Sequence, residues 1–231
     1  MMLALGAAGL AGVGGLLAWG TYEPNAPVFG PVVHRGARDA IYLTFDDGPN
    51  PKATPAILEV LTRDAAPGTF FMVGRHARAW PDVARAVAQT GSLIGNHTDT
   101  HVKLHLRSRS RIRSELAAAH ATLSRLTGTA PVAFRAPHGY RSPLVPRAAS
   151  ELGYRTFGWT FGVWDSAGPP AEVIRARVRR RLRPGAIVLL HDGDGYDPAG
   201  DRMPTARALP GIIRDVRDAG FELRSLSELL A

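Results

Sequence analysis

The chain has 231 residues, of which 45% are hydrophobic and 21% are charged, and it contains no cysteine. This length and composition are those of a globular protein with one or two domains, which excludes a disordered or fibrous chain. The absence of cysteine excludes a disulfide framework, a thiolate metal site and a cysteine nucleophile. The net charge of +8 comes almost entirely from arginine, because only Lys52 and Lys103 are lysines.

Arginines cluster in one segment, and bulk charge of this kind is weak evidence for a partner. We interpret the cluster as a solvated helix face, with a patch facing an anionic envelope polymer or lipid as the alternative. A nucleic-acid binder would lose affinity steeply with salt. Such a function gives no role to the acidic residues and histidines at the strand ends, so we expect no nucleic acid as a partner. The clustered arginines are Arg175, Arg177, Arg179, Arg180, Arg181 and Arg183.

The segment Met1–Trp19 contains no charged side chain. As a helix it would span roughly 28 Å, about the hydrocarbon thickness of a bilayer. Residues 1–20 are therefore predicted to be a signal peptide or a membrane anchor. No Lys or Arg precedes the apolar run, whereas Ala18 and Gly20 form a small-residue pair suited to cleavage before Thr21. Either alternative places the protein outside the cytoplasm, membrane-anchored or secreted, and the proline-containing residues 21–38 are predicted to be a linker.

Strand-like and helical patterns alternate between residues 39 and 231, which indicates a parallel sheet. About seven such units fit one α/β domain, built as an open or closed barrel, better than they fit two domains. The predicted strands are Ile41–Phe45, Thr69–Val73, Ser92–Gly95, Val132–Phe134, Arg155–Phe161, Ala186–Leu190 and Phe221–Leu226. The predicted helices are Thr54–Arg63, Pro81–Gln89, Ser108–Leu126, Pro143–Leu152, Ala171–Leu182 and Arg207–Ala219.

Polar residues follow the carboxyl ends of several predicted strands. In α/β barrels this rim carries the functional site, with contributions from different strands. Chance placement of polar groups at so many strand ends is hard to credit, so we interpret them as one site. The residues are Asp46 and Asp47, His97 and His101, Arg135, Asp165, and His191 with Asp192.

His97 and His101 have the i, i+4 spacing that, on a helical turn, lets both imidazoles share a metal ion. Asp46 or Asp47 can supply a carboxylate as the third ligand, which leaves an open position for water. Each pattern also has a simpler interpretation. Asp-Asp-Gly-Pro is a typical turn, and His191 at the end of an apolar strand can be a buried packing residue. From the residue types alone these alternatives stay open.

Taken together, the residues resemble the motifs of the polysaccharide deacetylase family, carbohydrate esterase family 4, with its NodB-homology domain. Residues 44–49 (TFDDGP) resemble the first motif and residues 97–101 (HTDTH) the second. Residues 135–139 (RAPHG) resemble the third motif and residues 189–191 (LLH) the fifth. The match runs in the family's order, and it implies a distorted (β/α)7-type barrel as the catalytic domain at 39–231.

The resemblance implies a role for each matching position. Asp47, His97 and His101 would hold a divalent metal ion, usually Zn²⁺, with Co²⁺, Mn²⁺ or Ni²⁺ as alternatives. Asp46 would be the general base, and Arg135 would hold and orient it.

The remaining roles concern the acid and the substrate. His191 would be the general acid, tuned by Asp165. The backbone N–H of His138 would help to form the oxyanion hole, and Leu189 would line the pocket for the acetyl methyl group. The fourth motif departs from the family, because Trp164 precedes Asp165 where a tryptophan is expected after it. His138 also replaces the common tyrosine, so both departures alter the expected sugar groove and leave the reacting groups in place.

The resemblance implies a metal-dependent hydrolase that removes N-acetyl groups from an envelope polysaccharide, either peptidoglycan or another glycan containing N-acetylglucosamine. The acetylated polysaccharide is the expected partner, and an uncleaved N-terminal segment would add the membrane. An O-deacetylase of a xylan-like polymer or exopolysaccharide is the alternative within the same class. A catalytically inactive carbohydrate-binding protein is the alternative from another class, and the presence of every reacting group argues against it.

Overall fold

The computed structural model describes residues 2–230, and it describes side chains from residue 12 onward. Within these residues, eight parallel strands form one sheet in the order β5-β4-β3-β2-β1-β7-β6, with β8 paired to the start of β1. This arrangement confirms the predicted α/β barrel with a parallel sheet, in the form of an open half-barrel. The strands are β1 Ala40–Asp46, β2 Thr69–Met72, β3 Leu93–Asn96, β4 Ala133–Phe134, β5 Arg155–Thr156, β6 Phe161–Gly162, β7 Ile187–His191 and β8 Glu222–Leu223.

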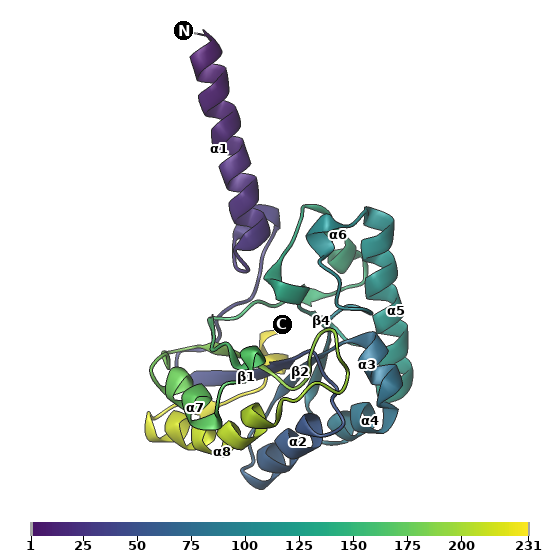
Figure 1. Cartoon of the computed structure of the whole chain (residues 1–231), viewed down its shortest axis with the longest axis vertical. Coiled ribbons are helices and arrows are strands. Elements are labelled where there is room, and N and C mark those ends of the chain that lie inside the picture. Colours follow the sequence, from purple (N-terminus) through teal and green to yellow (C-terminus); the bar gives the residue numbers. More distant parts are fainter. Residues whose placement is uncertain (1, 231) are drawn as a thin grey trace.

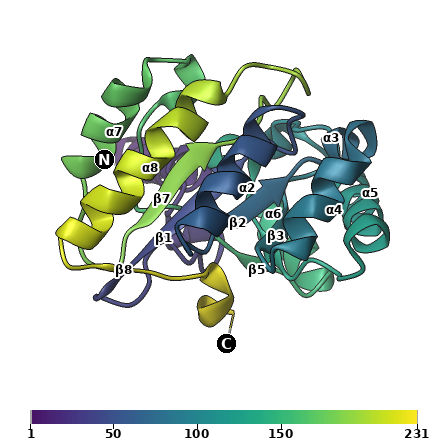
Figure 2. The same cartoon turned by 90° about the horizontal axis from the view of Figure 1, so that it is seen from below.

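Helices surround the outer face of the sheet, as Figures 1 and 2 show from two directions. Helix α1 extends away from the rest of the molecule in Figure 1. In Figure 2, α8 and α2 lie over the central strands β7 and β1. The helices are α1 Met2–Tyr22, α2 Ala53–Arg63, α3 Gly74–Ala79, α4 Pro81–Gln89, α5 Arg109–Thr127, α6 Leu144–Glu151, α7 Ala171–Arg179 and α8 Met203–Asp218.

The central strand β1 shows how the sheet positions the site. Its side chains alternate between the two faces of the sheet. Ile41, Leu43 and Phe45 belong to the large core between the sheet and the outer helices. The intervening positions, Tyr42, Thr44 and Asp46, therefore share the inner face, where Tyr42 packs in a second core cluster. Asp46 is the last residue of the strand, so the alternation delivers its carboxylate to the carboxyl rim of the half-barrel.

The main differences from the predicted elements are a shorter last strand, a divided strand and an additional helix. The predicted strand Phe221–Leu226 is reduced to β8, Glu222–Leu223, and Leu226 already belongs to a 3₁₀ helix at Leu226–Leu229. The stretch Arg155–Phe161 was predicted as one strand, but it forms β5 and β6 at opposite ends of the sheet order, with residues 157–160 crossing between them. Phe157, inside the predicted strand, is buried in the inner core, and β6 pairs with β7 instead. Helix α3 is absent from the prediction because its six residues are too few to show a helical repeat.

The amino-terminal segment contacts the catalytic body. Val33 forms an isolated bridge with Phe157, and the side-chain amide of Asn25 donates to the carbonyl of Trp159 at 2.9 Å. The buried Arg141 donates to the carbonyl of Ala26 at 2.5 Å. Residues 24–36 thus pack against the barrel, and the proposed boundaries at 20 and 38 stay predictions.

Among residues 12–230, whose side chains the structure describes, no helix is long and apolar enough to cross a membrane. The predicted signal peptide or anchor at 1–20 falls largely on residues 1–11, whose side chains lie outside the described set. The choice between an anchor and a cleaved signal therefore stays a prediction.

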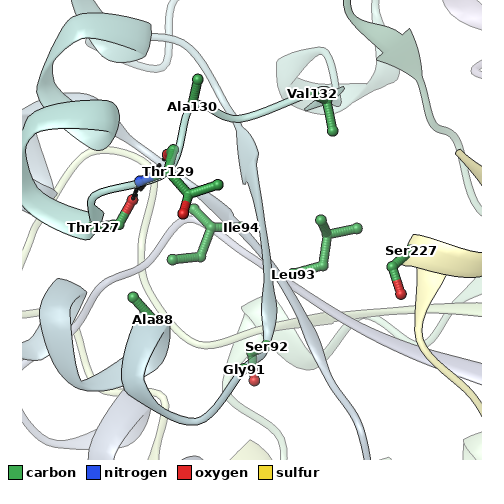
Figure 3. Close-up of a pocket in the computed structure, with 10 residues that line it drawn as sticks. All are labelled: Ala88, Gly91, Ser92, Leu93, Ile94, Thr127, Thr129, Ala130, Val132 and Ser227. Carbon is green, nitrogen blue, oxygen red and sulfur yellow. Dashed lines mark hydrogen bonds between the residues drawn. The ribbon is translucent and has the colours of Figure 1, made fainter.

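A surface pocket at the amino end of β3 lies opposite the rim that carries the polar residues (Figure 3). Its lining consists of small and apolar side chains with hydroxyls from Ser92, Thr127, Thr129 and Ser227. None of the residues that line it is titratable. The predicted acidic residues and histidines gather instead at the carboxyl ends of the strands, where α/β barrels place their active sites.

Candidate active site

The carboxyl ends of β1, β3, β4 and β7 bring most of the predicted residues to one cavity. In the sheet register, Asp46 at the end of β1 pairs with His191 at the end of β7. His97 follows β3 directly, and Arg135 follows β4. The cavity has a volume of about 220 Å³. Its lining includes Asp46, Asp47, His97, His101, His138, Leu189 and His191 from the predicted set, together with Trp159, Ser166, Asp194, Gly195, Tyr196 and Arg202.

Asp47, His97 and His101 form a buried group whose ligand atoms all lie within 4.8 Å of one another. The Nε2 atoms of His97 and His101 lie 3.3 Å and 3.0 Å from Oδ1 of Asp47. That oxygen is buried and makes no well-aligned hydrogen bond. Two imidazoles and one carboxylate are a common ligand set for a divalent ion, so the residues fit a metal ion.

Supporting contacts hold this group in place. The Nδ1 atom of His97 lies 2.8 Å from the carbonyl oxygen of Arg135, which leaves Nε2 as the atom that can bind metal. His76 makes a similar 2.8 Å contact with the carbonyl of Asp47. Burial acts to raise the pKa of Asp47, but the close imidazoles of His101 and His97 outweigh it and hold that pKa well below its usual value. The carboxylate is therefore ready to bind a cation.

The two histidines meet in a way that their spacing did not predict. The i, i+4 spacing suggested a helical turn, but residues 97–101 form an irregular loop. Thr98 and His101 have left-handed backbone conformations, with φ of 69° and 57°. Glu115 of α5 stabilises the loop by accepting from the backbone N–H groups of Asp99 and Thr100, at 3.0 and 2.8 Å. The two imidazoles thus come together through the backbone conformation of this loop. A left-handed backbone is strained in residues other than glycine, and such strain is common at functional sites.

Asp46 faces a different set of partners from its neighbour Asp47. The Nη1 of Arg135 donates to Oδ1 of Asp46 at 2.7 Å and to the hydroxyl of Thr44 at 2.8 Å. Its Nη2 donates to the carbonyl of Gly158 at 2.7 Å. Arg135 is fully buried beneath Phe71, with its guanidinium carbon 4.1 Å from the ring centroid. These contacts fix the orientation of the guanidinium. The guanidinium binds Oδ1 of Asp46, and Oδ2 lies 3.8 Å from Nε2 of His97 on the side of the cavity.

His191 is held by the carboxylate of Asp165. The Nδ1 of His191 lies 2.9 Å from Oδ1 of Asp165, and the backbone N–H of His191 donates to Oδ2 at 2.7 Å. Thr205 of α8 donates its hydroxyl to the same Oδ2. Burial lowers the pKa of His191, but Asp165 and the nearby Asp47 and Asp46 carboxylates outweigh it and raise that pKa to about 9. The imidazole is accordingly protonated at neutral pH.

The loop between β7 and α8 closes one side of the cavity. The ring of Tyr196 contacts the ring of His101 edge-on at 5.2 Å, and its hydroxyl lies 3.0 Å from Nε2 of His138. Arg75 holds the loop by donating to the carbonyls of Gly195 and Tyr196 at 2.7 and 2.9 Å. His138 has a φ of 58°. Burial lowers its pKa to about 4, and the neighbouring His101 contributes to the shift.

The structure brings together every site residue that the sequence predicted, although the roles assigned to these residues stay predictions. The residues that the sequence did not predict are His76, Thr205, Tyr196 and the Asp194–Arg202 pair. Each acts through a contact made after folding. A pattern search records His76 only as a further histidine after the second predicted strand, because no motif or spacing connects it to the other polar residues.

Comparison with known proteins decides the family. Residues 34–157 match the family model described as Polysaccharide deacetylase. The chain belongs to this polysaccharide deacetylase family, carbohydrate esterase family 4. It is therefore a hydrolase of the polysaccharide deacetylase class, as the motifs predicted. A chitooligosaccharide deacetylase from Azorhizobium caulinodans is 35% identical over 196 residues, which cover 82% of this chain and 93% of that protein.

Other deacetylases of the family are similarly related. A peptidoglycan-N-acetylglucosamine deacetylase from Bacillus cereus is 34% identical over 192 residues, covering 82% of this chain and 87% of that protein. The solved structure of a peptidoglycan N-acetylglucosamine deacetylase superposes with a TM-score of 0.80 at 29% identity, covering 85% of this chain and 91% of that one. The fold is thus the NodB-homology (β/α)7 fold that the resemblance implied.

Proposed function

We propose that this polysaccharide deacetylase removes N-acetyl groups from a cell-envelope glycan that contains N-acetylglucosamine, with peptidoglycan as the leading substrate. The observation that carries the proposal is one cavity in which a buried Asp47–His97–His101 group lies beside Asp46 and His191. The names of its relatives support the same chemistry, because they act on chitooligosaccharides and on peptidoglycan.

The residues present fit Zn²⁺, which we propose as the resident ion, held by Asp47, His97 and His101. When bound, such an ion lowers the pKa of water from about 15.7 to about 7 and polarises a carbonyl oxygen. Asp46 lies 3.8 Å from Nε2 of His97 and is therefore beside the same site. Its free oxygen accepts the proton of the attacking water, while Arg135 keeps the carboxylate oriented.

His191 supplies the proton that the leaving amine needs. An amine is a poor leaving group until it is protonated, and a positioned acid typically contributes about 10²–10⁴ in rate. With a pKa of about 9, His191 holds this proton throughout the neutral range. Asp165 acts as a positioning residue, because it contacts both the ring and the backbone N–H of His191.

The acetyl group is proposed to lie against Leu189. Leu189 lines the cavity together with Trp159 and His191, so an apolar methyl group has a surface to contact there. The backbone N–H of His138 is proposed to stabilise the oxyanion, a contribution that is typically worth 10²–10³ in kcat for one donor.

We further infer that the protein works outside the cytoplasm. The support is the uncharged segment Met1–Trp19, which suits either a signal peptide or an anchor. Cell fractionation with an antibody against the catalytic domain tests this inference, and recovery of the mature protein in the cytoplasm would overturn it.

Acetate release by the purified full-length protein tests the proposed activity. The substrates are N-acetylglucosamine oligomers, peptidoglycan and acetylated xylan, each with and without a chelator. The proposal predicts chelator-sensitive release from the first two, with one free amine formed per acetate. Release from xylan alone would replace N-deacetylation by the O-deacetylase alternative, and silence across the panel despite bound metal would favour a glycan-binding protein.

A further inference from the structure

A second cavity continues from the catalytic one along β6. It has a volume of about 390 Å³. It shares His138, Trp159, Ser166, Leu189 and His191 with the catalytic cavity, so the two form one continuous groove. The residues found only in the second part are Tyr140, Phe161, Gly162, Val163, Trp164 and Arg181.

Trp164 stands at the edge of this groove in an unusual conformation. Trp164 is 73% exposed, the highest value among the large hydrophobic residues of the described chain. Its φ of 58° is left-handed, which is rare and costly for a bulky residue. Strain of this kind persists where the surroundings impose it and often serves function. Here it presents an indole ring to solvent beside the catalytic groove.

Three arginines without an acidic partner among the described residues lie along the same strand. The guanidinium groups of Arg177, Arg181 and Arg183 donate to the carbonyls of Val163, Gly162 and Thr160, at 2.9, 2.5 and 2.8 Å. Within the described chain none of the three forms an ion pair, although Arg175 of the same helix pairs with Asp215. Each guanidinium has five N–H donors, so most of them stay available.

The positive charge lies on the groove side, and the acidic residue of the neighbouring helix α7 lies away from it. Arg181 lines the cavity itself, whereas Glu172, the acidic residue of α7, lies in the first turn at the other end of that helix. The lining of the groove therefore combines several aromatic rings with one guanidinium group. Aromatic faces carry partial negative charge and suit the C–H face of a sugar ring. A guanidinium suits a carboxylate.

We propose that this groove binds the sugar next to the acetylated unit, that Trp164 stacks on its ring, and that Arg181 selects a glycan whose neighbouring sugar carries a carboxylate. The inference rests on the proposed function and deepens it, because it separates an acidic glycan, such as a peptidoglycan strand with free muramic-acid carboxylates, from a neutral oligomer of N-acetylglucosamine. Charge complementarity carries the choice, since Arg181 lines this part of the groove and no carboxylate is among the described residues that line it.

The test compares two soluble substrates of equal length with the full-length protein. One is an oligomer of N-acetylglucosamine, and the other is a peptidoglycan-derived oligosaccharide that bears carboxylates. Arg181→Gln is expected to lower the ratio of kcat/KM for the acidic over the neutral substrate by about threefold to fivefold, the range of an exposed ion pair. The loss appears in KM, and Arg181→Lys restores most of it. Arg180→Gln is the matched control, because Arg180 is also exposed but does not line the groove, and it leaves the ratio unchanged.

Trp164 is tested separately, because stacking does not depend on the substrate's charge. Trp164→Ala is expected to raise KM for both oligosaccharides by about fivefold, and Trp164→Phe by less. Raising the salt concentration lowers the ratio of kcat/KM for the acidic over the neutral substrate in the wild type and leaves this ratio unchanged in Arg181→Gln.

Two results would overturn the inference: an Arg181→Gln variant with an unaltered ratio, or a Trp164→Ala variant with unaltered KM values. Absence of turnover with both substrates would instead overturn the proposed function. Calorimetric binding of the two oligosaccharides to Asp46→Asn protein then still decides the charge preference, because binding does not require catalysis.

Discussion

At the scale of single residues, Asp46 and Asp47 are adjacent in sequence but serve different neighbours. Asp46 ends a strand and meets the guanidinium of Arg135, whereas Asp47 turns away with a φ of 76° and meets the imidazoles of His97 and His101. The resemblance at 44–49 implied different roles for the two carboxylates. The left-handed conformation that separates them follows from packing, because His76 binds the Asp47 carbonyl only in the folded chain.

The different roles proposed for Asp46 and for the Asp47–His97–His101 group predict opposite effects on metal content for two variants. Asp46→Asn is expected to lower kcat by about 10²–10⁴ and to keep one metal ion per chain, because it removes a base and no ligand. His97→Ala is expected to lose metal and activity together. Metal content by mass spectrometry and acetate release measure both. Full activity in Asp46→Asn, or stoichiometric metal in His97→Ala, would contradict the assignment.

The contact between His191 and Asp165 predicts an alkaline limit to activity. The acid is lost when His191 deprotonates, so kcat/KM should fall as the pH rises through about 9. Asp165→Asn removes the largest favourable influence and should shift this limb to lower pH. Because the folded pKa is raised above 6.5, protonated His191 also stabilises the fold at low pH, and that contribution disappears as the pH rises through about 9. A pH profile with the same alkaline limb in both proteins would rule out this role of Asp165.

At the scale of elements, strong periodicity was enough to predict the central strands and long helices. β1 and α5 lie within two residues of their predicted bounds, since β1 is mostly apolar and buried along its whole length and Ser108 caps α5 by accepting from the N–H of Arg111. The break between β5 and β6 was not predictable, because the choice between one strand and two depends on which neighbouring strand offers a hydrogen-bonding edge. Short elements such as α3 carry too few residues for a pattern.

The loop between β7 and α8 gives a prediction at this scale. Gly195 is buried against His101, and a Cβ at this position would overlap the imidazole ring. Gly195→Ala should therefore displace His101 or the loop and weaken metal affinity by about tenfold or more, the loss typical of disturbed ligand support. Ala199→Ser, an exposed change in the same loop, is the control. Metal affinity measured by competition with a chelator checks the prediction, and equal affinities for Gly195→Ala and wild type would contradict it.

At the scale of the whole molecule, the half-barrel and the amino-terminal segment both contact the crossing segment at residues 157–160, which lies beside the site. The chain crosses between the sheet's ends at residues 157–160, where Gly158 accepts from Arg135 and Trp159 accepts from Asn25. The composition of 21–38 suggested a linker because proline and glycine are common there. Its contacts with the barrel depend on partners more than 100 positions away in sequence, which no local pattern records.

These contacts predict how truncation affects stability. A chain that begins at residue 21 should keep the melting temperature of the catalytic body. A chain that begins at residue 39 should melt about 5 °C lower or more, because the buried Arg141 loses the Ala26 carbonyl and an unsatisfied buried polar group costs about 1–3 kcal/mol. Differential scanning calorimetry of the two chains measures this, and equal melting temperatures would mean that 21–38 contributes nothing to the fold.

The central claim is that the buried Asp47–His97–His101 group and Asp46 together perform metal-dependent N-deacetylation. Its most direct test is acetate release from N-acetylglucosamine oligomers by full-length protein as purified, after chelation, and after Zn²⁺ is added back, with Asp46→Asn treated in parallel. We predict activity that disappears on chelation and returns with Zn²⁺, while Asp46→Asn binds the ion and stays inactive. Acetate release that persists after complete removal of metal, or that Asp46→Asn matches, would contradict the claim.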